Sequence, residues 1–441
     1  MATLPAELIH AIVGHIPDLP TPPLHPDRYP RPDTPTLRAC CLAAPVFVDP
    51  AQRRMHRILY VKSTLETDGK DKTPLWTRAL EHFAATPRLA GYVTHLRVHI
   101  DGEEDAANSE AAQCVLALLE HVEELSVGPY TRSWGDDFLW EFCVQGVAMA
   151  LLDWMRRRCS KIRPLERITL FHLSLIPLAF MRGVYEAARF VELLNVSVDD
   201  WGNAVTNSQP RQSDIASIRA LRARDSCGAV GLLLRNDFHQ YTSQLEMIFI
   251  PHGDEDDAAP ISALCVFRAV GLKSLYLDHQ YSNAEDECSV PPNLRLPTHL
   301  PNLTHLSLKV VRIVSGSNTF ERPWLSSSIL PALLVPSCTP SLNEITIHVV
   351  LYFWDKNRFR PLGEDVRNLD DAFSVHPALE RVHWLVDVNT RGYLVEGIRK
   401  DPAWGAIFLG LVQQALPKTT AKRRLQVDVV QKDSDFTLQE T

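Results

Sequence analysis

A short apolar triplet recurs along the chain, and it constrains the fold more than any other feature of the sequence. Each copy contains an apolar residue, two variable residues, a second apolar residue, one variable residue and a third apolar residue. The last two apolar positions alternate with a variable one, as in a strand that buries one face. The copies are Val93-Leu96-Val98, Val122-Leu125-Val127, Leu165-Ile168-Leu170, Val191-Leu194-Val196, Leu245-Ile248-Ile250, Leu272-Leu275-Leu277, Leu303-Leu306-Leu308, Leu342-Ile345-Ile347 and Leu379-Val382-Trp384.

The intervals between copies indicate a repeat array with irregular units. Neighbouring copies start 26 to 54 residues apart, whereas regular leucine-rich repeats have a period of about 20 to 29 residues. The triplet resembles the L-x-x-L-x-L strand of a leucine-rich repeat, although the asparagine or cysteine that often follows that strand is missing. The longest interval has room for another copy near Ile218 and Leu221. We therefore expect a degenerate leucine-rich-repeat domain over residues 61–430.

Helical segments are predicted between several copies of the triplet. The order strand, helix, strand predicts right-handed crossovers and a parallel sheet. Stacked units of this kind form a curved solenoid with strands inside and helices outside, so the predicted fold class is α/β. A closing strand is expected over residues 425–430, and a frayed tail over 431–441. The predicted helices cover residues 108–122, 139–158, 261–270, 328–334 and 406–415.

The N-terminal segment has a helical pattern instead. Leu8, Ile12 and Ile16 recur every four residues, and Ile9 and Val13 lie beside them. This is a broad apolar stripe on a helix of roughly three turns. One helix cannot bury such a stripe against itself, so the segment requires a small helical packet or another chain. A helix that only caps the solenoid is the alternative.

The first sixty residues carry a resemblance to the F-box. The opening Leu4-Pro5-Ala6-Glu7-Leu8, followed by Ile12 and Ile16, resembles its first helix. Residues 36–42 resemble the second helix and residues 51–60 the third. Two features depart from the family: a proline-rich insert over residues 17–35, which we expect to be a linker without a fold, and Phe47 where the family often has Trp.

An F-box followed by irregular leucine-rich repeats is similar to the fungal-type F-box family. The resemblance implies a substrate-recruiting subunit of an SCF ubiquitin ligase. Its F-box would dock on a Skp-type adaptor, which joins a cullin scaffold, and its repeats would bind a protein substrate for ubiquitin-dependent degradation. An interaction scaffold without a ligase role is the alternative. The residues that the resemblance assigns to the adaptor contact are Leu4, Pro5, Leu8, Ile9, Ile12, Leu37, Leu42 and Leu59.

Substrate-binding residues are predicted from the alternation of each strand. The variable residue between the last two apolar positions, and the one just after the triplet, face away from the buried side of the sheet. Aromatic residues among mixed polar ones suit a protein interface. The predicted positions are Arg97, His99, Phe171, Asn195, Tyr276, Asp278, Lys309, His348 and His383, together with Thr169, Ser197, Ser307 and Thr346.

Other classes of protein are disfavoured by composition. The net charge of −8 argues against nucleic-acid binding. The apolar runs fall short of the roughly 20 residues of a membrane helix, and the N-terminus lacks the pattern of a secretory signal. We therefore expect the cytoplasm, the nucleus or both. Nine cysteines without a C-x-x-C pair are expected to be reduced, mostly buried thiols.

No catalytic motif stands out in the sequence. G-x-S-x-G, H-E-x-x-H, the Walker loop and G-x-G-x-x-G are missing. The acidic runs 101–105 and 254–257 are predicted to be solvated loops, because adjacent carboxylates in a loop do not converge on one ion. Histidines beside the strands, such as His95 and His305, are either ordinary surface residues or part of a pH-sensitive or metal-binding face. We expect neither an enzyme nor a bound cofactor.

Overall fold

The computed structural model divides into two compact units, Met1–Ala216 and Ser217–Thr441, and each is described by itself. The residues that the structure describes are 5–16, 18–19, 31–63, 75–100, 106–129, 138–140, 145–161, 163–199, 218–251, 255–280, 296–314, 329–353, 364–389 and 403–432.

The first unit begins with a packet of short helices. Its elements are α1 (Ala6–Gly14), β1 (Asp18–Leu19), β2 (Arg31–Pro32), α2 (Thr34–Ala43), η1 (Pro45–Phe47) and α3 (Val48–Met55). β1 pairs with β2 in antiparallel fashion, so part of the predicted insert is structured. The α2 helix is capped by Asp33, whose carboxylate accepts a hydrogen bond from the Thr36 N–H at 3.3 Å. α1 packs against α3 and η1.

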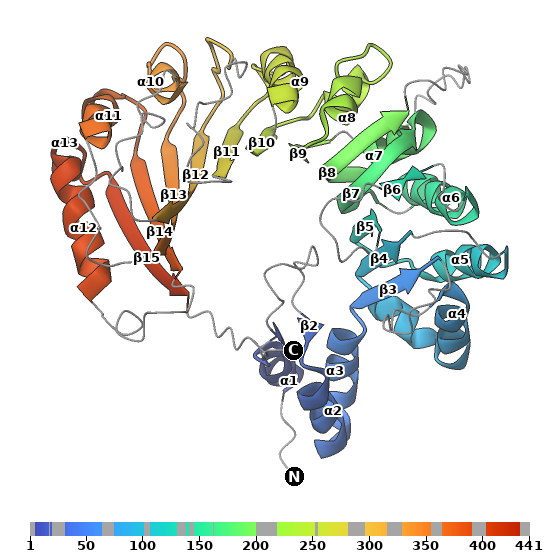
Figure 1. The fold of residues 1–441 in the computed structure, drawn as a ribbon. Helices are drawn as coiled ribbons and strands as arrows, with labels where there is room; N and C mark the ends of the chain where they lie inside the picture. The colour runs from blue at the N-terminus through green and yellow to red at the C-terminus, as the bar shows by residue number, and fades with distance from the viewer. Residues whose placement is uncertain are drawn as a thin grey trace. The chain divides into compact units, whose positions relative to one another are not determined.

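Parallel strands alternating with helices make up the rest of the first unit (Figure 1). The elements are β3 (Ile58–Lys62), α4 (Trp76–Ala85), η2 (Pro87–Tyr92), β4 (His95–His99), α5 (Ala106–Leu118), β5 (Glu124–Gly128), β6 (Phe138–Leu139), α6 (Gln145–Lys161), β7 (Leu165–Pro177), α7 (Leu178–Ala187) and β8 (Ala188–Asp199). Strands β3, β4, β5, β7 and β8 pair in that order, and every pair is parallel. The short β6 pairs with β7.

The second unit has the same arrangement of parallel strands and intervening helices. Its elements are β9 (Ala220–Arg224), α8 (Cys227–Leu232), η4 (His239–Thr242), β10 (Met247–Pro251), α9 (Glu255–Phe267), β11 (Ser274–Gln280), β12 (His305–Val314), α10 (Ile329–Leu333), β13 (Glu344–Phe353), α11 (Glu364–Val375), β14 (Arg381–Asn389), α12 (Ala403–Ala415), α13 (Pro417–Ala421) and β15 (Leu425–Lys432). From β9 to β15, each strand pairs with the next in parallel. The predicted α/β fold with a parallel sheet is confirmed.

The apolar triplets lie in register on neighbouring strands. The middle residue of one copy, Leu275, faces Ile248 on one side and Leu306 on the other. In the second unit, the first and middle residues of every predicted copy are at most 1% exposed. Full burial of one such side chain stabilises the fold by about 1.5–3 kcal/mol. The triplets are therefore the core of each unit, as a repeat solenoid requires.

A repeated hydrogen-bond pattern links the starts of the strands. Just before several strands, one carbonyl accepts hydrogen bonds from two consecutive N–H groups at the start of the next strand. For example, the Lys273 carbonyl accepts from Thr304 at 2.8 Å and from His305 at 3.1 Å. In the first unit the Arg57 carbonyl does the same with Thr94 and His95, both at 2.9 Å. Because the pattern recurs at the same point of the repeat, it holds neighbouring strands in register.

One strand differs from the sequence analysis, and another confirms its hidden copy. β8 pairs Val191 with Ile168, so its triplet is Ala188-Val191-Leu193, and the predicted Val191-Leu194-Val196 is wrong. Leu193 and Leu194 are adjacent, so the sequence alone fits a triplet through either leucine. The hidden copy is confirmed, because Leu221 faces Ile248 in β9.

Some helix boundaries also differ. Leu139 lies in β6, although we predicted a helix from this residue, and α6 begins at Gln145. Residues 255–257 form the first turn of α9, so most of the predicted acidic loop is helical; acidic residues are favourable at a helix N-terminus. The acidic run 101–105 and the tail residues 433–441 lie outside the described residues.

Candidate functional site

A small apolar core holds the N-terminal packet together. Val13 of α1, Leu37 of α2 and Ala51 of α3 are 3%, 0% and 0% exposed, and they pack against one another. Phe47, at the position where the F-box family often has Trp, packs against this core. The other partly buried residues around it are Ile16, Cys40, Cys41 and Met55. The packet therefore has a core of its own.

The same packet leaves four large apolar side chains open to solvent. Leu8 and Ile12 of α1 are 51% and 46% exposed, Leu42 of α2 is 88% exposed and Val46 of η1 is 50% exposed. We call these four residues the packet surface. Their elements contact one another, since η1 packs against both α1 and α2. Contiguous exposed apolar patches mark interaction sites. If α1 only capped the solenoid with its apolar stripe, Leu8 and Ile12 would be covered.

The other residues assigned to the adaptor contact fall into different environments. Pro5 is exposed, whereas Ile9 and Leu37 are 6% and 0% exposed and hold the packet together. Leu59 was expected on the third helix, but α3 ends at Met55 and Leu59 lies in β3, where it faces Leu96. Leu4 lies outside the described residues.

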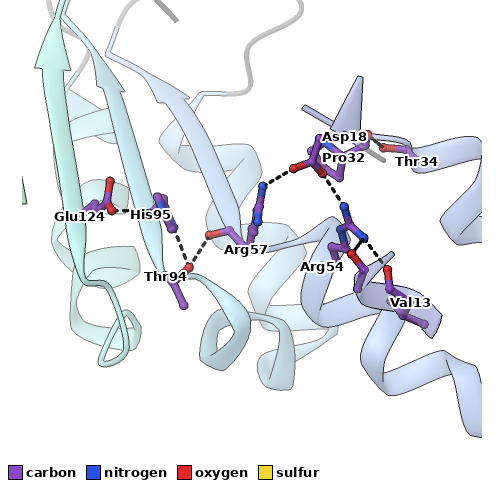
Figure 2. Close-up of polar contacts among 10 residues, drawn as sticks. Val13, Asp18, Pro32, Thr34, Arg54, Arg57, Thr94, His95 and Glu124 are labelled. Atoms are coloured by element: carbon purple, nitrogen blue, oxygen red, sulfur yellow. Dashed lines mark hydrogen bonds and ion pairs between the residues drawn. The ribbon is translucent and has the colours of Figure 1, made fainter. Parts of the chain in front are cut away.

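A carboxylate beside α1 joins the packet to the first strands of the repeats (Figure 2). Asp18 Oδ1 lies 2.9 Å from Arg54 Nη2, and Asp18 Oδ2 lies 3.0 Å from Arg57 Nη2. Arg54 also donates to the Val13 carbonyl and, at 3.1 Å, to the Gly14 carbonyl. The sequence analysis missed this cluster, because one aspartate after a helix carries no signal of two arginines about forty residues away.

A second polar contact joins α3 to η2. Asp49 accepts hydrogen bonds from Tyr92 Oη and, at 2.8 Å, from Arg53 Nε. These hydrogen bonds lower the pKa of the Asp49 carboxyl, the one from Tyr92 most. Gln52 accepts a hydrogen bond from Arg88 at 2.9 Å. α3 is therefore attached to the repeats along its own length.

On the sheet of the first unit, three of the predicted substrate-binding residues are buried. Arg97 and His99 are each 3% exposed, and Phe171 is 5% exposed. Asn195 is partly exposed and has a positive φ of 55°, and its side-chain nitrogen lies 3.3 Å from His172 Nδ1. Asn195 is thus accessible on this sheet, as are Thr169 and the exposed Ser197, and substrate binding by the predicted residues stays a prediction.

In the second unit, the predicted positions are more accessible. Tyr276, Lys309, His348 and His383 are all partly exposed. Tyr276 stacks on Phe249 of the preceding strand, with 4.2 Å between ring centroids and 15° between ring planes. The side chain of Asp278 lies outside the described part of the chain.

The two histidines each pair with a carboxylate on the following strand. His348 Nε2 lies 2.9 Å from Asp387 Oδ2, and His383 Nε2 lies 2.8 Å from Asp428 Oδ2. The residues described in the structure contain no group of three or more His, Cys, Asp or Glu side chains that could hold a metal ion. Each pair is a hydrogen-bonded contact between neighbouring strands.

The buried Cys265 and the partly buried Cys159 are unsuited to nucleophilic chemistry near neutral pH. Burial raises the pKa of Cys265 to about 12 and that of Cys159 to about 11. The thiolate is the reactive form, so both side chains stay protonated and inert. Cys114 and Cys227 are exposed, so the prediction of mostly buried thiols holds for only part of the set.

Comparison with known proteins assigns the chain to no family. The sequence matches no protein-family model and no curated protein. Among the described helices, none combines the length and the apolar character needed to span a membrane.

Proposed function

We propose that this protein is the substrate-recognition subunit of an SCF-type ubiquitin ligase. The observation that carries the proposal is the packet surface: Leu8, Ile12, Leu42 and Val46 are exposed on a helical packet that already has its own core. The F-box-like sequence of the same segment names a Skp-type adaptor as the partner, and the cullin scaffold joins through that adaptor.

The α1 helix both anchors itself in the packet and presents apolar side chains to a partner. Ile9 and Val13 of α1 are buried and anchor the helix, while Leu8 and Ile12 on the same helix stay exposed. Burying Leu8 and Ile12 against a partner would contribute about 1.5–3 kcal/mol each if burial were complete. Such a contact is large enough to hold a second protein when several residues act together.

The repeats supply the second surface, which would hold a protein substrate. The accessible predicted residues are Thr169, Asn195 and Ser197 in the first unit and Tyr276, Ser307, Lys309, Thr346, His348 and His383 in the second. An aromatic residue among basic and polar ones suits a protein interface. The protein would act without chemistry of its own, by raising the effective concentration of a substrate lysine near the conjugating enzyme. This function places it in the cytoplasm, the nucleus or both.

Substitution of the packet surface tests the proposal. In a pull-down with a purified Skp-type adaptor, Leu8→Asp plus Ile12→Asp should abolish capture, because two charges would be buried unpaired at the interface. The matched control is Leu118→Asp plus Met149→Asp, which alters side chains of similar exposure, 43% and 52%, outside the packet. This control should bind like the unsubstituted protein. Circular dichroism checks that both variants fold.

A scaffold without a ligase role is the competing function. A well-folded chain that captures neither adaptor nor cullin would favour it and end the ligase proposal. Capture that the packet substitutions do not weaken would show that the adaptor binds elsewhere.

A further inference from the structure

We infer that Asp18 is a positioning residue that fixes the helical packet onto the first strands of the repeats. Asp18 lies in β1, just after α1, in a segment whose sequence suggested only a linker. Its carboxylate contacts two arginines on either side of the point where α3 ends and β3 begins. Figure 2 shows this carboxylate between Arg54 and Arg57.

The contacts of Asp18 are shielded from solvent. Its side chain is 18% exposed and that of Arg54 is 14% exposed, while Arg57 is 33% exposed. Exposed ion pairs contribute little because water and salt screen them, and partly buried pairs are screened much less. A carboxylate that bridges two guanidinium groups also restricts both arginine side chains at once.

Arg54 connects Asp18 to the end of α1. Its guanidinium donates to the carbonyls of Val13 and Gly14, which lie in the last turn of that helix. Helix C-terminal carbonyls lack partners within the helix and favour a positive charge nearby. The position of α1 is therefore coupled to the Asp18 carboxylate through one side chain.

Arg57 connects Asp18 to the repeats. Its main-chain carbonyl accepts hydrogen bonds from the N–H groups of Thr94 and His95, both at 2.9 Å, at the start of β4. His95 in turn lies 3.6 Å from Glu124 of β5. Figure 2 shows the same path through the Thr94 hydroxyl, which contacts the Arg57 carbonyl and His95, and on to Glu124. The side chain of Arg57 thus faces the packet while its backbone belongs to the strand ladder.

Asp49 is the other carboxylate at this junction, and it is less shielded. Its side chain is 51% exposed in its pair with Arg53, which is 59% exposed. We therefore expect Asp18 to restrict the junction more than Asp49 does. Because the packet core does not include Asp18, its loss should loosen the junction and leave the core of Val13, Leu37 and Ala51 intact. This inference goes beyond the proposed function and does not depend on it.

A distance measurement in the full-length chain tests the inference. Spin labels are placed on α2 through Ala39→Cys and on α5 through the native, exposed Cys114, with the other reactive cysteines replaced by serine. Asp18→Ala should broaden the distance distribution by about twofold, since a restrained junction becomes an ensemble. Asp18→Glu keeps a carboxylate and should stay narrower than Asp18→Ala. Asp153→Ala removes a carboxylate that is 61% exposed on α6 and should change nothing.

Hydrogen exchange decides between positioning and folding. Unchanged protection of α1 to α3 in Asp18→Ala, together with a broader distribution, supports a positioning role. An unchanged distribution overturns the inference. Loss of protection across the packet also overturns it, because Asp18 would then be needed for the packet to fold. The distance measurement uses this chain alone, without the adaptor. Its result is therefore independent of whether the proposed function is correct.

Discussion

His348 hydrogen-bonds to Asp387, which lies two residues beyond its direct neighbour Leu385 on the adjacent strand. The same offset recurs one strand later between His383 and Asp428. The two contacts have nearly equal lengths, 2.9 and 2.8 Å. Their carboxylates differ in burial, because the side chain of Asp387 is 9% exposed and that of Asp428 is 50% exposed. The same histidine–aspartate contact therefore occurs once with a buried carboxylate and once with an exposed one.

Burial should therefore set the stability that each carboxylate contributes. Asp387→Ala leaves the partly buried His348 without its hydrogen bond to a buried carboxylate and should lower the free energy of unfolding by about 1–3 kcal/mol. Asp428→Ala removes an exposed partner and should cost less than about 1 kcal/mol. Urea denaturation of the two variants measures the difference. Equal midpoints would show that the buried pair is no stronger than the exposed one.

Arg158 of α6 caps main-chain carbonyls in the connection between α5 and β5. It is 3% exposed and donates to the carbonyls of Glu120 at 2.7 Å and Val122 at 2.6 Å. Burial lowers the pKa of its guanidinium. Arg158→Met should destabilise the protein by about 2–4 kcal/mol, because charged hydrogen bonds are lost and the carbonyls stay buried. The neighbouring exposed Arg157→Met should cost less than about 0.5 kcal/mol; similar losses in urea denaturation would contradict a capping role.

The strand pattern made most of the repeat architecture predictable. An apolar triplet at fixed spacing shows which face is buried, and that face is buried in the structure at Leu275, Leu306 and Ile345. The pattern failed where it was ambiguous. Leu59 follows a run of residues that suits a helix, and only its pairing with Leu96 makes it a strand residue.

Residue 128 must be glycine because Phe171 lies too close for a Cβ atom. A Cβ at residue 128 would lie 2.5 Å from the Phe171 ring and 2.5 Å from its carbonyl oxygen. Gly128→Ala should therefore destabilise the first unit by about 1–3 kcal/mol through overpacking. Gly410→Ala on α12 meets no atom within 4 Å, and it should stabilise by about 0.5–1 kcal/mol because alanine favours helix. Thermal unfolding measures both; a neutral Gly128→Ala would mean that Phe171 moves freely.

The packet could be predicted only in part. The five apolar positions of the N-terminal stripe identify a helix, but they cover too wide an arc to tell the anchoring side from the exposed side. Val13 turns inward and Ile12 outward because of Leu37 and Ala51, which come from other helices. Asp18 illustrates the same limit, since its partners are set by tertiary packing alone.

His376 should make the second unit sensitive to acid. Its side chain is 1% exposed, and neither ring nitrogen has a hydrogen-bond partner in the described part of the chain. Burial lowers the pKa of His376 below its usual value, and the nearby Arg424 lowers it further, while the backbone at Thr339 partly opposes this shift. In the unfolded chain a histidine titrates near pH 6.5. Below that pH the unfolded state binds more protons than the native state, so stability falls as the pH is lowered from about 7 towards 5.

His376→Leu should therefore reduce the loss of stability on the acid side, while stability at pH 7.5 stays the same or rises because a buried unsatisfied group is removed. Urea denaturation midpoints of both proteins between pH 5 and about 7.5 provide the measurement. His56, whose pKa is also lowered by burial, contributes with the same sign and leaves a residual slope in the variant. His121→Gln, at an exposed position, controls for the loss of a histidine as such. If His376→Leu loses as much stability on acidification as the unsubstituted chain, His376 is not the source of the acid sensitivity.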